Sequence, residues 1–218
     1  LLADEPLLTY AVGAWIGLAA WLLWLDHSGE HPGLEALLSR LGPVRHTALH
    51  WAIAAPLPFF ATLVYTRFRP LDAWLGIVLA ILAWACFDLT HAPGLRRSAL
   101  FRRWSIPWYV ASYGCSVAAP VVALIYDNQP VLAVTLLAAA ALYFASAATW
   151  RHSTWLIPGG LTLPVGLLLL LDFWGVPWHK QTPILALVPA AYVLAGLWLE
   201  HRRGVPRRFM ATLYGVAH

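Results

Sequence analysis

Long apolar stretches separated by short polar segments make up most of this chain. Seven of them cover roughly residues 6–26, 47–66, 70–90, 106–126, 130–150, 155–174 and 183–200. Each approaches the ~20 residues that an α-helix needs to cross about 30 Å of hydrocarbon. The pattern therefore predicts an all-α, polytopic integral membrane protein, with residues 1–218 forming a single transmembrane helical domain.

Two segments do not fit this spanning pattern. The stretch "HPGLEALLSRL" at 31–41 begins near a proline and is followed by Gly42-Pro43. It places four leucines on one helical face, at positions 34, 37, 38 and 41. We expect a short helix in the membrane interface, with packing against the bundle as an equally ordinary role. Residues 202–218 are interpreted as a cytoplasmic tail or the start of a further helix.

Composition supports a membrane protein and changes the meaning of the net charge. Hydrophobic residues make up 61% of the chain and charged residues 11%, whereas a soluble domain carries about a quarter charged residues. A net charge of +4 would suggest nucleic acid in a soluble protein, but here the lipid bilayer is the expected partner and nucleic acid is not. No separate signal-peptide core precedes the first stretch, so we expect no cleaved signal peptide.

The basic residues are distributed unevenly between the two sides of the predicted bundle. With the N-terminus outside, eleven of the 14 Lys and Arg residues fall in inner segments and three, Arg67, Arg69 and Lys180, in outer ones. Basic residues accumulate on the cytoplasmic side of membrane proteins. The chain is therefore predicted to be N-out/C-in, in the inner (cytoplasmic) membrane of a bacterium or archaeon. The pair Arg67 and Arg69, in "RFRP", is the main exception to this rule.

Alternate spans share a proline near the start and a histidine near the end. The prolines are Pro6, Pro70, Pro130 and Pro183, and the histidines are His27, His91, His152 and His201. Proline suits the first turn because its missing N–H would be unsatisfied there, and histidine in the last turn can bond free carbonyls. We expect repeated helical hairpins, each packing chiefly on its neighbours.

Tryptophans and interior prolines add two further expectations. Many of the 13 tryptophans lie near span ends, where interfacial anchoring explains most of them. The prolines inside spans are Pro56, Pro58, Pro120, Pro164 and Pro189. They should kink their helices and free backbone carbonyls. Such kinks can line a substrate path, which keeps a transporter among the alternatives.

The sharpest constellation of chemical groups lies at the ends of the second and third spans. His46 and His50 are one helical turn apart, and Asp88 and His91 follow at a matching depth. An intramembrane carboxylate is costly and marks a functional candidate. Two histidines and an aspartate could hold Zn²⁺ with an open water position, and histidines could also bind haem or a chlorophyll-type pigment. The structural interpretation is that these residues mark helix ends at the membrane interface.

Known motifs do not extend this constellation. The seven-helix zinc hydrolases of the ceramidase and adiponectin-receptor type carry a Ser-x₃-His in the second helix, an Asp in the third and a His-x₃-His in the last, where this chain has His201 alone. A retinal protein needs a lysine in its last span, but Lys180 precedes the last span of this chain. Cys86 and Cys115 lie inside spans without CxxC spacing and are expected to be packing residues.

Three functional hypotheses follow. The first is a non-enzymatic, tryptophan-rich membrane module, either a scaffold subunit associated with other membrane protein subunits or the membrane region of a longer protein. The second is a metal- or cofactor-dependent membrane enzyme that uses His46, His50, Asp88 and His91. The third is a transporter. The chain does not begin with methionine, and we expect that it is a processed or partial product.

Overall fold

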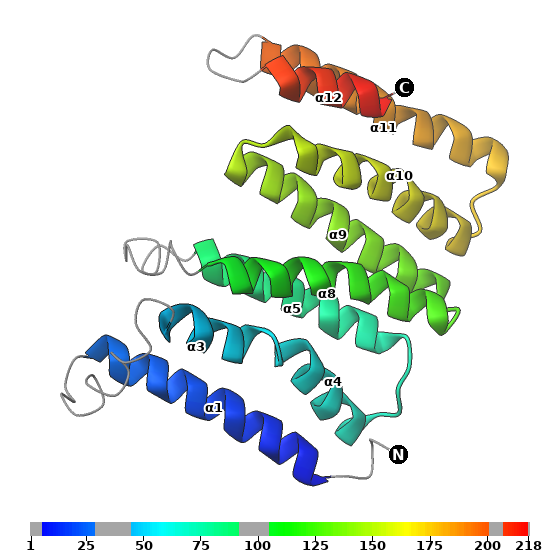
Figure 1. Ribbon diagram of the computed structural model, residues 1–218. Helices are drawn as coiled ribbons and strands as arrows, with labels where there is room; N and C mark the ends of the chain where they lie inside the picture. Colours follow the sequence, from blue (N-terminus) through cyan, green and yellow to red (C-terminus); the bar gives the residue numbers. More distant parts are fainter. Residues whose placement is uncertain (1–5, 29–44, 92–104, 201–206, 218) are drawn as a thin grey trace. The chain divides into compact units, whose positions relative to one another are not determined.

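The computed structural model describes residues 6–28, 45–91, 105–200 and 207–217, without the side chains of residues 26–28 and 45–46. The regular structure in these ranges is entirely helical (Figure 1). Seven helical segments are long and apolar enough to cross a membrane. The predictions of an all-α chain and of about seven membrane-spanning helices are confirmed at this level. The predicted interfacial helix at 31–41 lies outside the described residues.

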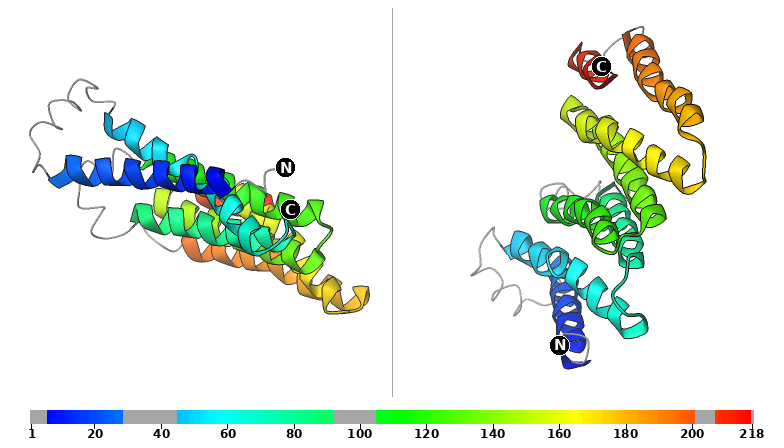
Figure 2. Two further views of the ribbon diagram at one scale, coloured as in Figure 1. Left: turned by 90° about the horizontal axis from the view of Figure 1, so that it is seen from below. Right: turned by 90° about the vertical axis from the view of Figure 1, so that its right-hand side faces the viewer.

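The described helices follow one another along the chain. Their bounds are α1 (Pro6–Ser28), α3 (Arg45–Ala54), α4 (Leu57–Phe68), α5 (Trp74–His91), α8 (Ile106–Ile125), α9 (Gln129–Trp150), α10 (Leu156–Phe173), α11 (Trp178–Glu200) and α12 (Arg207–Ala217), with a 3₁₀ turn, η2 (Ser153–Trp155), before α10. Helices α3 and α4 together form the second span. The chain divides into two compact units, Leu1–Cys115 and Ser116–His218, which are described separately. Within each unit, successive spans run back and forth (Figure 2).

Proline opens two of the four helices for which it was predicted to do so. Pro6 begins α1, and Pro130 follows the first residue of α9, whose N-cap Asn128 accepts a hydrogen bond from the Val131 N–H at 3.2 Å. The prediction is wrong for the other two helices. Helix α5 begins at Trp74, downstream of Pro70, where the Asp72 carboxylate accepts the Trp74 N–H at 2.9 Å. Helix α11 begins at Trp178, so its Pro183 lies inside the helix.

The second span is interrupted at Pro56, as expected for a proline inside a span. Proline has no N–H, so the Ala52 carbonyl loses the donor that a continuous helix would supply. The indole Nε1 of Trp15, on α1, donates to this carbonyl at 3.0 Å. The neighbouring helix thereby satisfies a backbone group that hydrocarbon would leave unpaired.

A second proline shows the same arrangement in the other unit. Pro164 lies inside α10, so the Gly160 carbonyl lacks its helical donor. The hydroxyl of Tyr192, on α11, donates to this carbonyl at 3.2 Å. In both units an aromatic side chain from an adjacent helix therefore bonds the carbonyl that a proline has freed.

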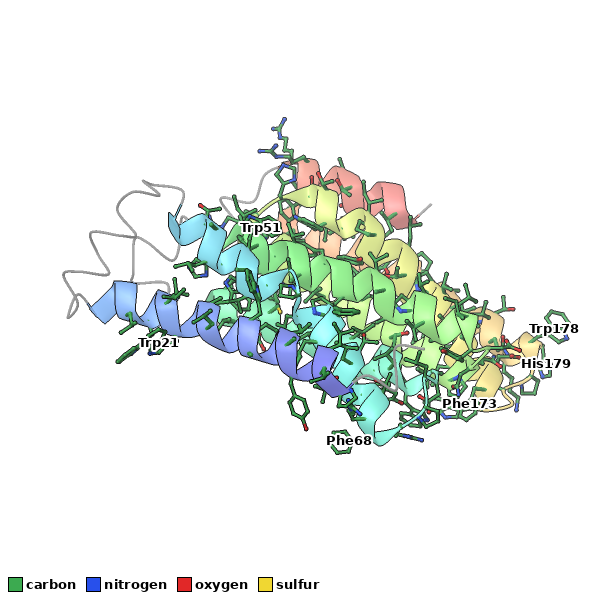
Figure 3. The ribbon with its side chains drawn as sticks, turned by 60° about the horizontal axis from the view of Figure 1, so that its bottom comes forward. Trp21, Trp51, Phe68, Phe173, Trp178 and His179 are labelled. Atoms are coloured by element: carbon green, nitrogen blue, oxygen red, sulfur yellow. The ribbon has the colours of Figure 1, made fainter. Side chains whose placement is uncertain are left out.

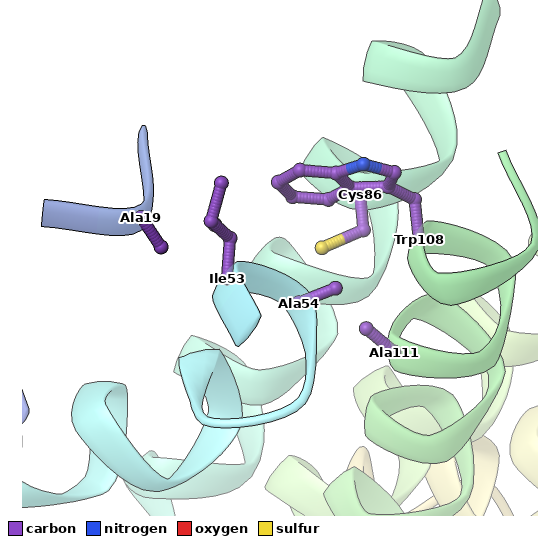
Figure 4. Packing of buried hydrophobic residues seen from close by; sticks show 6 residues of the cluster. All are labelled: Ala19, Ile53, Ala54, Cys86, Trp108 and Ala111. Atoms are coloured by element: carbon purple, nitrogen blue, oxygen red, sulfur yellow. The ribbon is translucent and has the colours of Figure 1, made fainter. Parts of the chain in front are cut away.

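Small residues allow close packing in the unit Leu1–Cys115. The buried cluster consists of Ala19, Ile53, Ala54, Cys86, Trp108 and Ala111. Figure 4 shows these side chains gathering between α1, α3, α5 and α8. The Ser112 hydroxyl donates to the Ala83 carbonyl at 2.7 Å and so joins α8 to α5. Cys86 and Cys115 are both buried, as expected for packing residues.

In the unit Ser116–His218, α12 turns back against α10 and α11. Its Phe209 and Leu213 are buried in a cluster with Leu156, Val188 and Tyr192. Glycine permits the contact with α10, because a Cβ at Gly160 would lie 2.2 Å from the Val216 Cγ1. Residues 207–217 of the predicted tail thus form a helix that packs on the spans.

The bond between Trp15 and Ala52 leads to a double-mutant prediction. Trp15→Phe should destabilise the protein by about 0.6–2 kcal/mol, because the Ala52 carbonyl loses its donor. In a Pro56→Ala background the same change should cost little, since alanine restores a backbone N–H at a position that already has helical dihedral angles (φ −78°, ψ −11°). Unfolding in detergent measures both, with the exposed Trp21→Phe as control. An equal cost in the two backgrounds would contradict this explanation.

Candidate functional site

The predicted site residues lie in the unit Leu1–Cys115, on α3 and at the end of α5. His46 and His50 belong to α3, and His46 precedes His50 by one turn. Asp88 and His91 are in the last turn of α5, and His91 is the final residue of that helix. The side chain of His46 lies outside the described residues.

His50 is buried and bonded to a neighbouring helix. Its side chain is 5% exposed, and the indole Nε1 of Trp108, on α8, donates to its Nδ1 at 3.1 Å. The two rings meet edge to face, with centroids 6.3 Å apart. Because Nδ1 accepts this hydrogen bond, its lone pair is occupied, and a metal bound at His50 would have to use Nε2. His50 therefore joins α3 to α8.

His91 bonds the end of its own helix. Its Nδ1 lies 2.7 Å from the Phe87 carbonyl oxygen. A carbonyl only accepts, so Nδ1 carries a proton and Nε2 faces the Tyr109 hydroxyl of α8, at 3.4 Å. His91 thus bonds a carbonyl of the last turn, but not a free one, because the Phe87 carbonyl lies within the helix and also accepts from the Thr90 hydroxyl at 2.6 Å. Of the other three predicted histidines, His152 follows the end of α9 and is exposed. The His27 side chain and His201 lie outside the described residues.

An aromatic cluster that we did not predict surrounds His91. The Phe87 and His91 rings have centroids 4.3 Å apart, and the Tyr109 ring meets both edge-on. Tyr109 stacks on Tyr113, one turn further along α8. The spacing of these two tyrosines was the available signal, since residues four apart share a helical face. The cluster fixes the orientation of the His91 ring against α8.

Asp88 is exposed, unlike its buried neighbours Phe87 and Thr90. Among the residues that the structure describes, no three His, Cys, Asp or Glu side chains come close enough to hold a metal ion together. His50, Asp88 and His91 therefore do not form a three-ligand site by themselves. A site that also uses His46, whether for Zn²⁺, haem or a pigment, stays a prediction because that side chain is not described.

Comparison with known protein families, curated proteins and solved structures finds no match to this chain. The function is therefore argued from the geometry of the chain itself.

The bond between Trp108 and His50 predicts a stability effect. Trp108→Phe keeps a large aromatic ring but removes the donor to the buried Nδ1, and should destabilise the protein by about 1–3 kcal/mol. Trp51→Phe is the matched control, because Trp51 adjoins His50 on α3 but is 37% exposed. Thermal unfolding in detergent compares the two variants. If they lose equal stability, the bond to His50 does not hold α3 against α8.

Proposed function

We propose that the chain is a non-enzymatic, multi-pass membrane module that associates with other membrane protein subunits. It is either a scaffold subunit of a larger complex or the membrane region of a longer protein. We further propose an N-out/C-in orientation in the inner membrane of a bacterium or archaeon, with the spans arranged as repeated hairpins. The uneven distribution of basic residues supports the orientation.

The observation that carries the proposal is the exposure of α1. In the apolar part of this helix 6% of the residues are buried, the smallest share among the spans that the structure describes. In its C-terminal half, Gly17, Ala20, Trp21 and Trp24 are exposed on one side, and we call them the α1 face. Figure 3 shows Trp21 projecting away from the helix. A spanning helix with so little buried surface has room for a neighbour.

The chemistry of the α1 face fits another transmembrane helix. A Cβ placed at Gly17 would meet no atom within 4 Å, so the backbone is open there. Small residues let two helix backbones approach closely in a membrane, where packing rather than the hydrophobic effect drives association. Trp21 and Trp24, 53% and 60% exposed, add large rigid surfaces beside that opening.

The candidate site supports a structural role rather than catalysis. His50 accepts a hydrogen bond from Trp108, and His91 donates to the Phe87 carbonyl of its own helix. Both imidazoles are therefore used to hold helices and helix ends in place. This use of the two histidines favours a scaffold over an enzyme.

Association through the α1 face predicts the effect of filling it. Gly17→Leu should reduce the amount of partner that copurifies from native membranes by about tenfold, because overpacking a contact costs about 1–3 kcal/mol. Gly114→Leu, on α8, is the matched control, since a Cβ there also meets nothing within 4 Å. Native gels and mass spectrometry after mild solubilisation measure the complex.

Two results would contradict this assignment. One is equal loss of partner in the Gly17→Leu and Gly114→Leu proteins. The other is a stoichiometric metal or pigment in the purified protein that disappears in His46→Ala, which would favour the enzyme.

The proposed orientation predicts which loops an impermeant thiol reagent reaches in intact cells. In a background with Cys86 and Cys115 replaced by alanine, Lys180→Cys should react from outside, because Lys180 is exposed at the start of α11. Ser98→Cys should react only after the membrane is permeabilised. The reverse labelling pattern would invert the orientation.

A further inference from the structure

A groove of about 510 Å³ lies between α1 and α4, at the N-terminal end of α1. Its described lining residues are Thr9, Tyr10, Gly13, Ala14, Phe60, Val64, Arg67 and Phe68. Most of these side chains are apolar, and Arg67 is the charged residue among them. The groove follows the N-terminal half of α1, whereas the α1 face occupies the C-terminal half of the same helix.

A close helix contact forms one end of the groove. A Cβ at Gly13 would lie 3.0 Å from Cε2 of Phe60, so α1 and α4 touch at this point. Towards the end of α4 the groove is bordered by Tyr10 and Phe68, which are 73% and 84% exposed. Figure 3 shows Phe68 projecting from the end of α4. The groove therefore begins at the end of a span and runs along the surface of the span.

The two arginines of "RFRP" differ in their surroundings. The guanidinium of Arg69 lies 3.6 Å from the Asp72 carboxylate, which also accepts hydrogen bonds from the Tyr65 hydroxyl and the Trp74 N–H. Within the described part of the chain, Arg67 has no such carboxylate partner. Asp72 therefore balances the charge of Arg69, while Arg67 is exposed at the groove without a carboxylate partner among the described residues.

The position of Arg67 matches the level of lipid headgroups. It occupies the last turn of α4, and the apolar span Thr47–Phe68 ends just beyond it. A planar guanidinium binds phosphate through paired, charge-assisted hydrogen bonds. Interaction with the C-terminal end of the helix dipole is also available to Arg67, but for an exposed group this is worth little and does not account for the adjoining groove.

We propose that this groove binds an anionic glycerophospholipid. One acyl chain lies along Ala14, Phe60 and Val64, and the phosphate lies on Arg67. The acyl chain fills the apolar part of the groove, and the phosphate places a negative charge beside Arg67.

The test uses delipidated, detergent-solubilised protein and two lipids with identical acyl chains, phosphatidylglycerol and phosphatidylcholine. Native mass spectrometry and thermal shift should show phosphatidylglycerol binding about tenfold more tightly, as expected for a charge-assisted contact. Arg67→Gln should remove this preference. Arg69→Gln, the matched control, should keep it because Asp72 already holds Arg69.

A second variant tests the apolar part of the groove. Ala14→Trp should fill it and weaken binding of both lipids, while the unfolding temperature without lipid stays near that of the wild type. The proposal is overturned if the wild-type protein binds the two lipids equally, or if Arg67→Gln and Arg69→Gln behave alike. It is also overturned if inorganic phosphate raises the unfolding temperature as much as the lipid does. A further contrary result is that a second copy of the chain fills the groove, in which case Ala14→Trp would dissociate a dimer without changing lipid binding.

Discussion

A backbone carbonyl inside a membrane must find a donor within the protein, and this constraint organises both units. Pro56 and Pro164 each free a carbonyl, and an aromatic donor from the adjacent helix bonds it: Trp15 reaches Ala52, and Tyr192 reaches Gly160. Dispersion between apolar helices is nearly the same for many rotations of one helix against another. The energy of a hydrogen bond, by contrast, depends on direction. Each of these contacts therefore fixes the rotation and the axial position of a helix pair.

A buried side chain, that of His50, likewise obtains its hydrogen bond from a neighbouring helix. His50 lies in the core of its unit with its Nδ1 bonded by an indole, and Ser112 joins α8 to α5 in a similar way. These two polar contacts join different helices and add specificity to otherwise uniform apolar surfaces. This use explains why residues with catalytic chemistry occur in a chain whose soluble segments are short.

Hydrophobic pattern alone was sufficient to place the spans, because the bilayer imposes one length on every helix that crosses it. It failed at the starts of α5 and α11. Helix α5 begins where the Asp72 carboxylate caps the Trp74 N–H, and α11 begins at Trp178, so neither helix starts at the predicted proline. The donors to freed carbonyls were also not predictable, since nothing in the sequence distinguishes Trp15 from other tryptophans until its partner helix is known. Likewise, one sequence rule treated Arg67 and Arg69 alike, whereas Asp72 distinguishes them.

The break at Pro56 has a consequence for synthesis of the protein. Of the described spans, the one containing α3 and α4 has the lowest mean hydropathy, 1.4, and neither helix is long enough to cross the bilayer alone. The Ala52 carbonyl and the His50 Nδ1 accept hydrogen bonds from residues on opposite sides of this span in the chain. Trp15 is already made when this span leaves the ribosome, whereas Trp108 is not. The Ala52 carbonyl can therefore be covered at once, while the His50 Nδ1 gains its indole donor only with α8, so this contact of the second span forms only after the fourth has entered the membrane.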